Sequence, residues 1–66
     1  MKQTEIKNLK KGEFIKRAIK GQPSADTYIK GDYDRATKSF SCISYNDINK
    51  EIFIKANKSV FYDFEF

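Results

Sequence analysis

The last seven residues, VFYDFEF at positions 60–66, show the strictest two-residue alternation in the chain. Successive side chains on a β-strand point to opposite faces, so such a segment has one apolar face and one mixed face. The apolar face takes Val60, Tyr62, Phe64 and Phe66, and the other takes Phe61, Asp63 and Glu65. A helix would instead need apolar residues three to four positions apart. The segment therefore predicts a β-strand.

Four further short runs favour strands because β-branched and aromatic residues recur in them. They cover residues 13–19, 27–33, 39–45 and 51–55, and turn-forming residues separate them at 20–26, 34–38, 46–50 and 56–59. Residues 4–11 fit either a helix of at most two turns or a lead-in strand with a turn, and we favour the turn. We predict an all-β fold: one small domain, residues 1–66, of about five antiparallel strands in a curled sheet or open barrel, with at most one short helical turn.

The core of a 66-residue chain must come from aromatic and aliphatic side chains. A domain this small buries a modest share of its surface. One cysteine and no histidine exclude an internal disulfide and the usual zinc sites. Six Phe and four Tyr supply bulk instead. The expected inner positions are Phe14 or Ile15, Ile29, Tyr33, Phe40, Cys42, Ile52, Ile54, Val60, Tyr62 and Phe64.

The sequence does not favour catalysis. Histidine, the commonest acid–base residue, is absent. Asp32 and Asp34 are close enough to share a site, but Arg35 and Lys38 lie close enough to neutralise both. Cys42 lacks a base beside it, and free cysteines are usually buried, so we expect it in the core. No glycine-rich phosphate loop is present. We expect no enzyme, no cofactor, no metal site and no small-molecule substrate.

The basic residues gather at the N-terminal end. Residues 1–20 carry seven basic and two acidic side chains, whereas residues 21–66 carry six basic and seven acidic ones, and the net charge is +4. Single-stranded nucleic acids bind positive surfaces with exposed aromatic rings. If Ile29 and Tyr33 face inward, then Tyr28, Lys30 and Asp32 face outward. An alternative nucleic-acid surface would therefore use Lys16, Arg17, Tyr28, Lys30, Arg35 and Lys38.

A protein-binding surface is the favoured hypothesis. Phe53 falls opposite Ile52 and Ile54, and Phe61 falls opposite Val60 and Tyr62, so both are surplus to one small core. Exposed together, Phe53 and Phe61 would form an apolar patch of the kind that marks partner sites or self-association. We therefore expect a non-enzymatic binding module whose partner is a protein or a second copy, with nucleic acid as the alternative.

The expected location is the cytoplasm. The lone thiol of Cys42 suits a reducing compartment. No apolar run approaches the roughly 20 residues that span a bilayer, and no secretion signal is visible. We therefore expect no membrane partner.

Three strings, together with the aromatic end, are distributed over most of the chain: LKKGEF at 9–14, YIKGDYDR at 28–35 and DINKEIF at 47–53. Together they resemble a group of small uncharacterised all-β proteins of bacterial, phage and mobile-element genomes. The strongest part is the hairpin string at residues 31–35. The resemblance implies a phage or mobile-element context and brings no activity or site residue with it.

Overall fold

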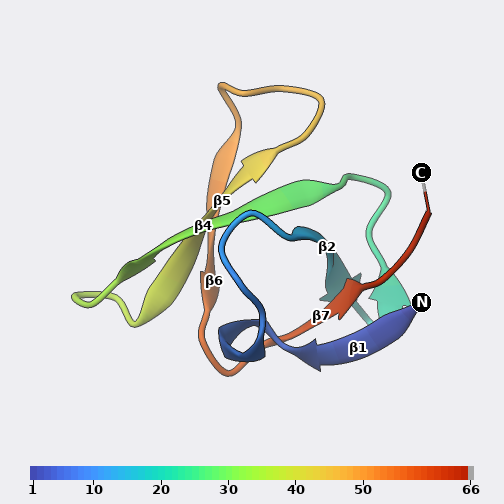
Figure 1. Cartoon of the computed structure of the whole chain (residues 1–66), viewed down its shortest axis with the longest axis horizontal. Helices are drawn as coiled ribbons and strands as arrows, with labels where there is room; N and C mark the ends of the chain where they lie inside the picture. Colours follow the sequence, from blue (N-terminus) through green and yellow to red (C-terminus); the bar gives the residue numbers. More distant parts are fainter. Residues whose placement is uncertain (66) are drawn as a thin grey trace.

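The computed structural model describes residues 1–65, which form β-strands and one 3₁₀ turn, η1, at Ile6–Asn8 (Figure 1). The strands are β1 (Lys2–Glu5), β2 (Phe14–Ile19), β3 (Gln22–Pro23), β4 (Tyr28–Asp34), β5 (Ser39–Ser44), β6 (Glu51–Lys55) and β7 (Ser59–Tyr62). All of their pairings are antiparallel. The predicted all-β class is confirmed.

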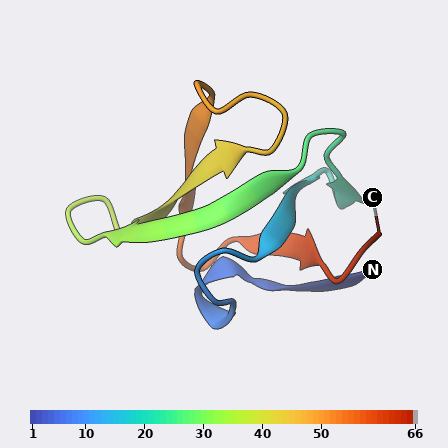
Figure 2. The same cartoon turned by 45° about the horizontal axis from the view of Figure 1, so that its top comes forward.

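The sheet has the strand order β1-β7-β2-β4-β5-β6, and β3 pairs with β2 beside this path. It curls around the core without closing into a barrel (Figures 1 and 2). The two strands beyond the expected five are β1 and β3. Part of the expected loop at 20–26 forms β3, because Lys20 and Gly21 have positive φ angles of 51° and 78°. Two such residues make the tight turn that suits a hairpin.

The open question at residues 4–11 resolves as a strand followed by a turn. β1 pairs with β7, and the chain then enters η1. The Ile6 N–H donates to the Lys58 carbonyl at 2.9 Å, and the Lys7 N–H donates to the Ala56 carbonyl at 3.2 Å. The N–H groups of Ile6 and Lys7 therefore bond to the distant turn that follows β6, and a two-turn helix does not form.

A β-bulge lies in the hairpin of β4 and β5. Lys30 pairs with Cys42, and Tyr33 pairs with Phe40, so two residues of β4 oppose one residue of β5 between these pairs. An extra residue reverses which side chains share a face. Gly31 occupies the bulge, as a glycine inside a strand indicates.

Because of the bulge, the residues of β4 before Gly31 face the opposite way from the expected one. Tyr28 and Lys30 were expected to face outward, but they are buried, with exposed fractions of 3% and 4%. Ile29 was expected inside, but it lies on the outer face and is half-buried. The prediction was wrong because it continued one alternation through Gly31.

Among residues 1–65, six apolar side chains form the buried core: Ile6, Ile15, Tyr28, Cys42, Ile54 and Val60. Of the expected inner positions, Ile15, Cys42, Ile54 and Val60 are confirmed as buried. Phe40 and Ile52 are half-buried and pack against this cluster. Ile6 and Tyr28 were not expected in the core, because η1 and the bulge set the direction of their side chains.

Three other expected inner residues are not buried. Tyr33 is exposed because its hairpin extends beyond the core, where its ring lies 5.0 Å from that of Phe40. Tyr62 and Phe64 are half-buried. β7 ends at Tyr62, since Asp63 has a φ of 57° and leaves the extended conformation. Phe66, the last residue expected in this strand, lies outside the described residues.

Lys30 is a buried cation with two partners. Its Nζ donates to the Leu9 carbonyl and lies 4.0 Å from the centre of the Phe40 ring. Burial lowers the pKa of Lys30, and the charge of Glu13 opposes that shift. The methylene stem packs in the core while the ammonium group is held by a carbonyl and an aromatic face.

Lys30→Ala is expected to lower the free energy of unfolding by about 2 kcal/mol, because it removes both the stem and the carbonyl bond. Lys30→Met keeps most of the stem and removes the cost of burying a charge, so its loss should be below about 1 kcal/mol. Urea unfolding of both variants measures the difference. Equal losses of unfolding free energy in the two variants would show that the methylene stem of Lys30 does not stabilise the core.

Candidate functional site

β6 lies at one end of the sheet, and its outer edge is not covered by the next strand. A turn at residues 56–58 joins β6 to β7, closed by a 3.0 Å hydrogen bond from the Lys58 N–H to the Lys55 carbonyl. β7 then turns away and pairs with β1 and β2 (Figures 1 and 2). Among residues 1–65, β6 pairs only with β5. This divergence leaves one edge of β6 open.

Two hydrogen bonds fix which residues of β6 bond to β5. The Ser44 N–H donates to the Lys50 carbonyl at 2.9 Å, and the Ala56 N–H donates to the Lys38 carbonyl at 3.1 Å. Bonded and non-bonded pairs alternate along an antiparallel ladder. The even-numbered residues of β6 therefore direct their main-chain groups to β5.

The odd-numbered residues of β6, Glu51, Phe53 and Lys55, direct their main-chain groups away from β5. The Lys55 carbonyl accepts the turn bond from Lys58. The Phe53 N–H and carbonyl face the open edge. A row of unpaired N–H and C=O groups at a sheet edge is a template for pairing with another chain.

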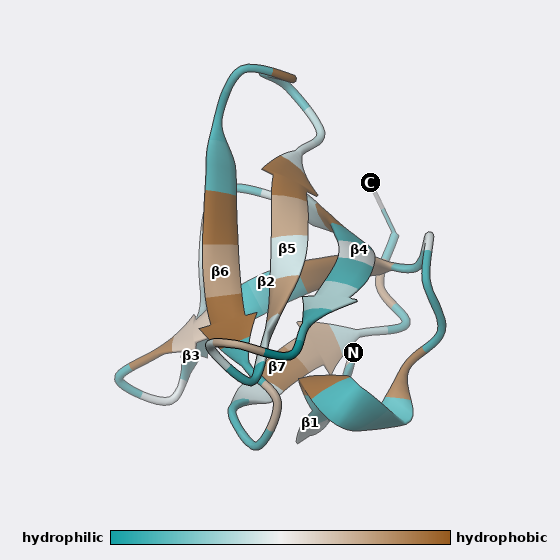
Figure 3. Cartoon of the chain, turned by 90° about the vertical axis from the view of Figure 1, so that its left-hand side faces the viewer, coloured by the Kyte–Doolittle hydropathy of each residue, from teal (hydrophilic) through white to brown (hydrophobic). Residues whose placement is uncertain are grey.

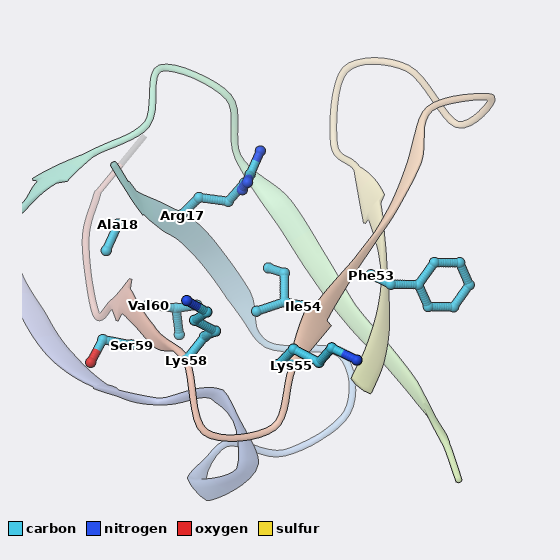
Figure 4. A pocket seen from close by; sticks show the side chains of 8 residues that line it. All are labelled: Arg17, Ala18, Phe53, Ile54, Lys55, Lys58, Ser59 and Val60. Atoms are coloured by element: carbon cyan, nitrogen blue, oxygen red, sulfur yellow. The ribbon is translucent and has the colours of Figure 1, made fainter. Parts of the chain in front are cut away.

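Phe53 is the large apolar side chain of this edge, and 57% of it is exposed. It points away from the core (Figure 4). Ile43 of β5 lies diagonally from it on the same face and is 38% exposed. The apolar bands of β6 lie in the middle of the strand, between its charged ends (Figure 3). Exposed apolar groups beside an open edge indicate a contact surface.

Two opposite charges flank Phe53 on the outer face. The Glu51 carboxylate accepts a hydrogen bond from the Ser41 hydroxyl, and the Lys55 Nζ donates to the Thr37 carbonyl at 2.8 Å. Neither charge takes part in an ion pair within the described part of the chain. The outer face of β6 therefore presents an acidic, an aromatic and a basic side chain in turn. Both charged side chains are hydrogen-bonded to neutral groups.

The opposite end of the sheet is protected. β1 is short and polar, with the sequence KQTE. Lys2 forms an exposed ion pair of 3.6 Å with Asp63. Short edge strands that carry lysine resist pairing with other chains. The two edges therefore differ, and only that of β6 presents an exposed aromatic residue.

A groove of about 210 Å³ lies between β6 and the strands β2 and β7. Ile54 and Val60 form its apolar floor, and Figure 4 shows Ile54 directed into it. Its cations are Arg17, Lys55 and Lys58, and no acidic residue is among the described residues that line it. The groove follows the open edge and is electropositive.

A second groove lies between the β4–β5 hairpin and the turn after β6. Its lining includes Lys7, Lys38 and Lys55, together with the exposed ring of Tyr33. Lys55 lines both grooves. Lys55 therefore joins the cations of the two grooves, and we call these cations the cationic track.

The structure separates the two phenylalanines expected to share an exposed patch. Phe53 is exposed, but Phe61 is half-buried and pairs with Gln3 and Lys16. In the strand order, β2, β4 and β5 stand between β7 and β6. The expected joint patch does not form, and of the two residues only Phe53 is exposed.

The structure does not bring the six residues of the expected nucleic-acid surface together. Tyr28 and Lys30 are buried, so they cannot stack or bind a strand on the surface. Arg17 lines the first groove, and Lys38 lines the second. Two others lie apart: Lys16 is half-buried, with its Nζ 5.3 Å from the centre of the Phe64 ring, and Arg35 is exposed in the β4–β5 turn.

Sequence reasoning missed Tyr33, Lys55 and Lys58 as surface residues. The available signal was the position of Lys55 and Lys58 on either side of a tight turn, which places both side chains next to the same turn.

The described residues contain no metal-binding cluster. In residues 1–65, no group of three or more His, Cys, Asp or Glu side chains is placed to hold a metal ion. Burial raises the pKa of the Cys42 thiol to about 11, so the thiol stays protonated at neutral pH. Cys42 is part of the core, as expected.

Comparisons of the chain with protein-family models, curated proteins and solved structures gave no match. Within residues 1–65, the structure has no helix of the length and apolar character needed to cross a membrane.

Proposed function

We propose that this protein is a non-enzymatic binding module that accepts an extended segment of a protein along the open edge of β6. The observation that carries the proposal is the unpaired main chain of Phe53 beside its exposed ring. The single protonated thiol fits a reducing compartment, and we place the module in the cytoplasm.

Strand addition uses main-chain hydrogen bonds for affinity and side-chain contacts for specificity. Here the main-chain bonds come from the odd-numbered residues of β6. The side-chain contacts come from the Phe53 ring on the outer face and from the apolar floor of the groove on the inner face. Glu51 and Lys55 add charge selection at the two ends of the strand. A bound segment should therefore alternate apolar and charged residues.

A displayed library of random nine-residue peptides tests this function. Selected peptides should bind the wild-type protein and lose at least tenfold in affinity for Phe53→Pro, which removes the outward N–H. Tyr45→Ala, away from the β6 edge, is the matched control and should leave binding unchanged. If selection yields only peptides that bind Phe53→Pro equally well, strand addition at this edge is refuted.

A second candidate function is binding of single-stranded nucleic acid along the cationic track. Its support is the pair of grooves that meet at Lys55, with Arg17, Lys58 and Lys38 beside the exposed Tyr33 ring. Binding of phosphates by lysine and arginine releases counterions, and affinity then falls steeply with salt. A ring beside such a track can stack on a base.

A mixed-sequence DNA single strand titrated at two salt concentrations tests this candidate. The affinity should fall with salt, and Lys55→Ala should weaken binding because Lys55 lines both grooves. Tyr33→Ala should weaken it by roughly tenfold if the ring stacks. Absence of binding at low salt removes the candidate.

A further inference from the structure

We infer that the segment bound at the β6 edge is β6 of a second copy of this chain, in an antiparallel pair centred on Phe53. The inference deepens the proposed function and rests on it. Its basis is that the sequence of β6, EIFIK, is complementary to itself when one copy is reversed.

The directions of the main-chain groups fix the pairing. The residues that face the open edge are odd-numbered, so the partner must also present odd-numbered residues. With Phe53 opposite Phe53 of the second copy, each N–H donates to the other copy's carbonyl across the two-fold axis. A shift by one residue would place groups already bonded to β5 at the interface and would lose these bonds.

This register also matches charge. Glu51 of one copy lies opposite Lys55 of the other, and the same pair repeats on the far side of the axis. Opposite charges placed directly across an antiparallel pair stabilise it. Both side chains lie on the outer face and carry no ion pair within the described chain. A parallel arrangement in the same register would bring like charges together and is disfavoured.

The inner face of the pair is apolar. Ile52 of one copy lies opposite Ile54 of the other, beside the groove floored by Ile54 and Val60. The two-fold axis uses the same edge of both copies, so the assembly closes as a dimer and does not extend into a filament.

Sedimentation equilibrium of charge-reversed variants tests the inference. The wild-type protein should show a monomer–dimer equilibrium between 7.7 kDa and about twice that mass. Glu51→Lys alone and Lys55→Glu alone should each weaken association by roughly tenfold or more, because each turns two attractive pairs into repulsive ones. The double variant should associate like the wild type.

A mixture of the two single variants gives the most specific test of the charge pairing. Each variant repels itself but is complementary to the other, so the equimolar mixture should recover the dimer. Far-ultraviolet circular dichroism of each variant confirms that it is folded. A wild-type protein that stays monomeric at all concentrations, or a dimer that both single reversals leave unchanged, overturns the inference. A monomer that still binds library peptides through Phe53 would overturn the inference and leave the proposed function standing.

Discussion

Ile52→Pro is expected to remove a large part of the free energy of unfolding, whereas Phe53→Pro is expected to remove little of it. The Ile52 N–H belongs to the set of β6 groups that face β5, and proline has no N–H to donate. Loss of a ladder bond together with the clash of the ring should cost on the order of 3 kcal/mol. A domain of this length has a total stability of only about 3–10 kcal/mol.

Phe53→Pro places the same residue type one position along, where the N–H faces the open edge. Proline is tolerated in edge strands on the side that faces solvent. Its cost should be about 1 kcal/mol, since the lost side chain is more exposed than buried. Thermal unfolding of both variants, followed by circular dichroism, measures the contrast. Equal stabilities, or the reverse order, would show that the hydrogen-bond assignment along β6 is wrong.

Gly31→Ala is expected to lower the free energy of unfolding by about 2–3 kcal/mol. A Cβ at position 31 would lie 2.7 Å from the Ser41 main-chain oxygen, which is nearer than such atoms approach. The obstacle is a backbone atom of the paired strand, so the bulge itself must open. For a domain of this size, that loss lowers the melting temperature by roughly 8–20 °C.

Asp32→Ala is the matched control, because Asp32 is the next residue of the same bulge. Its side chain is 80% exposed and, within the part of the chain that the structure describes, its interaction is an exposed ion pair of 2.7 Å with Lys11. Such pairs contribute about 0–1 kcal/mol. If Gly31→Ala melts within a few degrees of Asp32→Ala, the close approach of the two strands is not limiting.

The fold class followed from the sequence because the alternation is strong where β5, β6 and β7 occur. Cys42, Ile54 and Val60 lie on strands whose alternation is unbroken, and they were placed correctly. At positions 14 and 15 the sequence left two candidates, and Ile15 is the buried one. β4 shows where this reasoning fails. One extra residue at Gly31 reverses the faces on either side of it, and the sequence does not state whether a glycine marks a bulge or an ordinary strand position.

The candidate site was only partly predictable. Phe53 could be found because it is an aromatic residue between two inward isoleucines. The open edge could not, since it depends on where β7 goes after a short turn. Strand order depends on pairing between residues that are far apart in the sequence. β7 pairs with β1 and β2 and does not pair with β6, which precedes it in the sequence. The position of Lys55 in the lining of both grooves follows from the same strand pairing.

Amide hydrogen exchange of β6, measured at two protein concentrations, tests the central claim most directly. In the dilute protein, the Ile52 and Ile54 amides should be protected and the Phe53 amide should exchange quickly, since it faces solvent. At high concentration the Phe53 amide should become protected as the second copy covers the edge. A Phe53 amide as well protected as that of Ile54 in the dilute monomer would contradict the account, because the edge would then already be occupied.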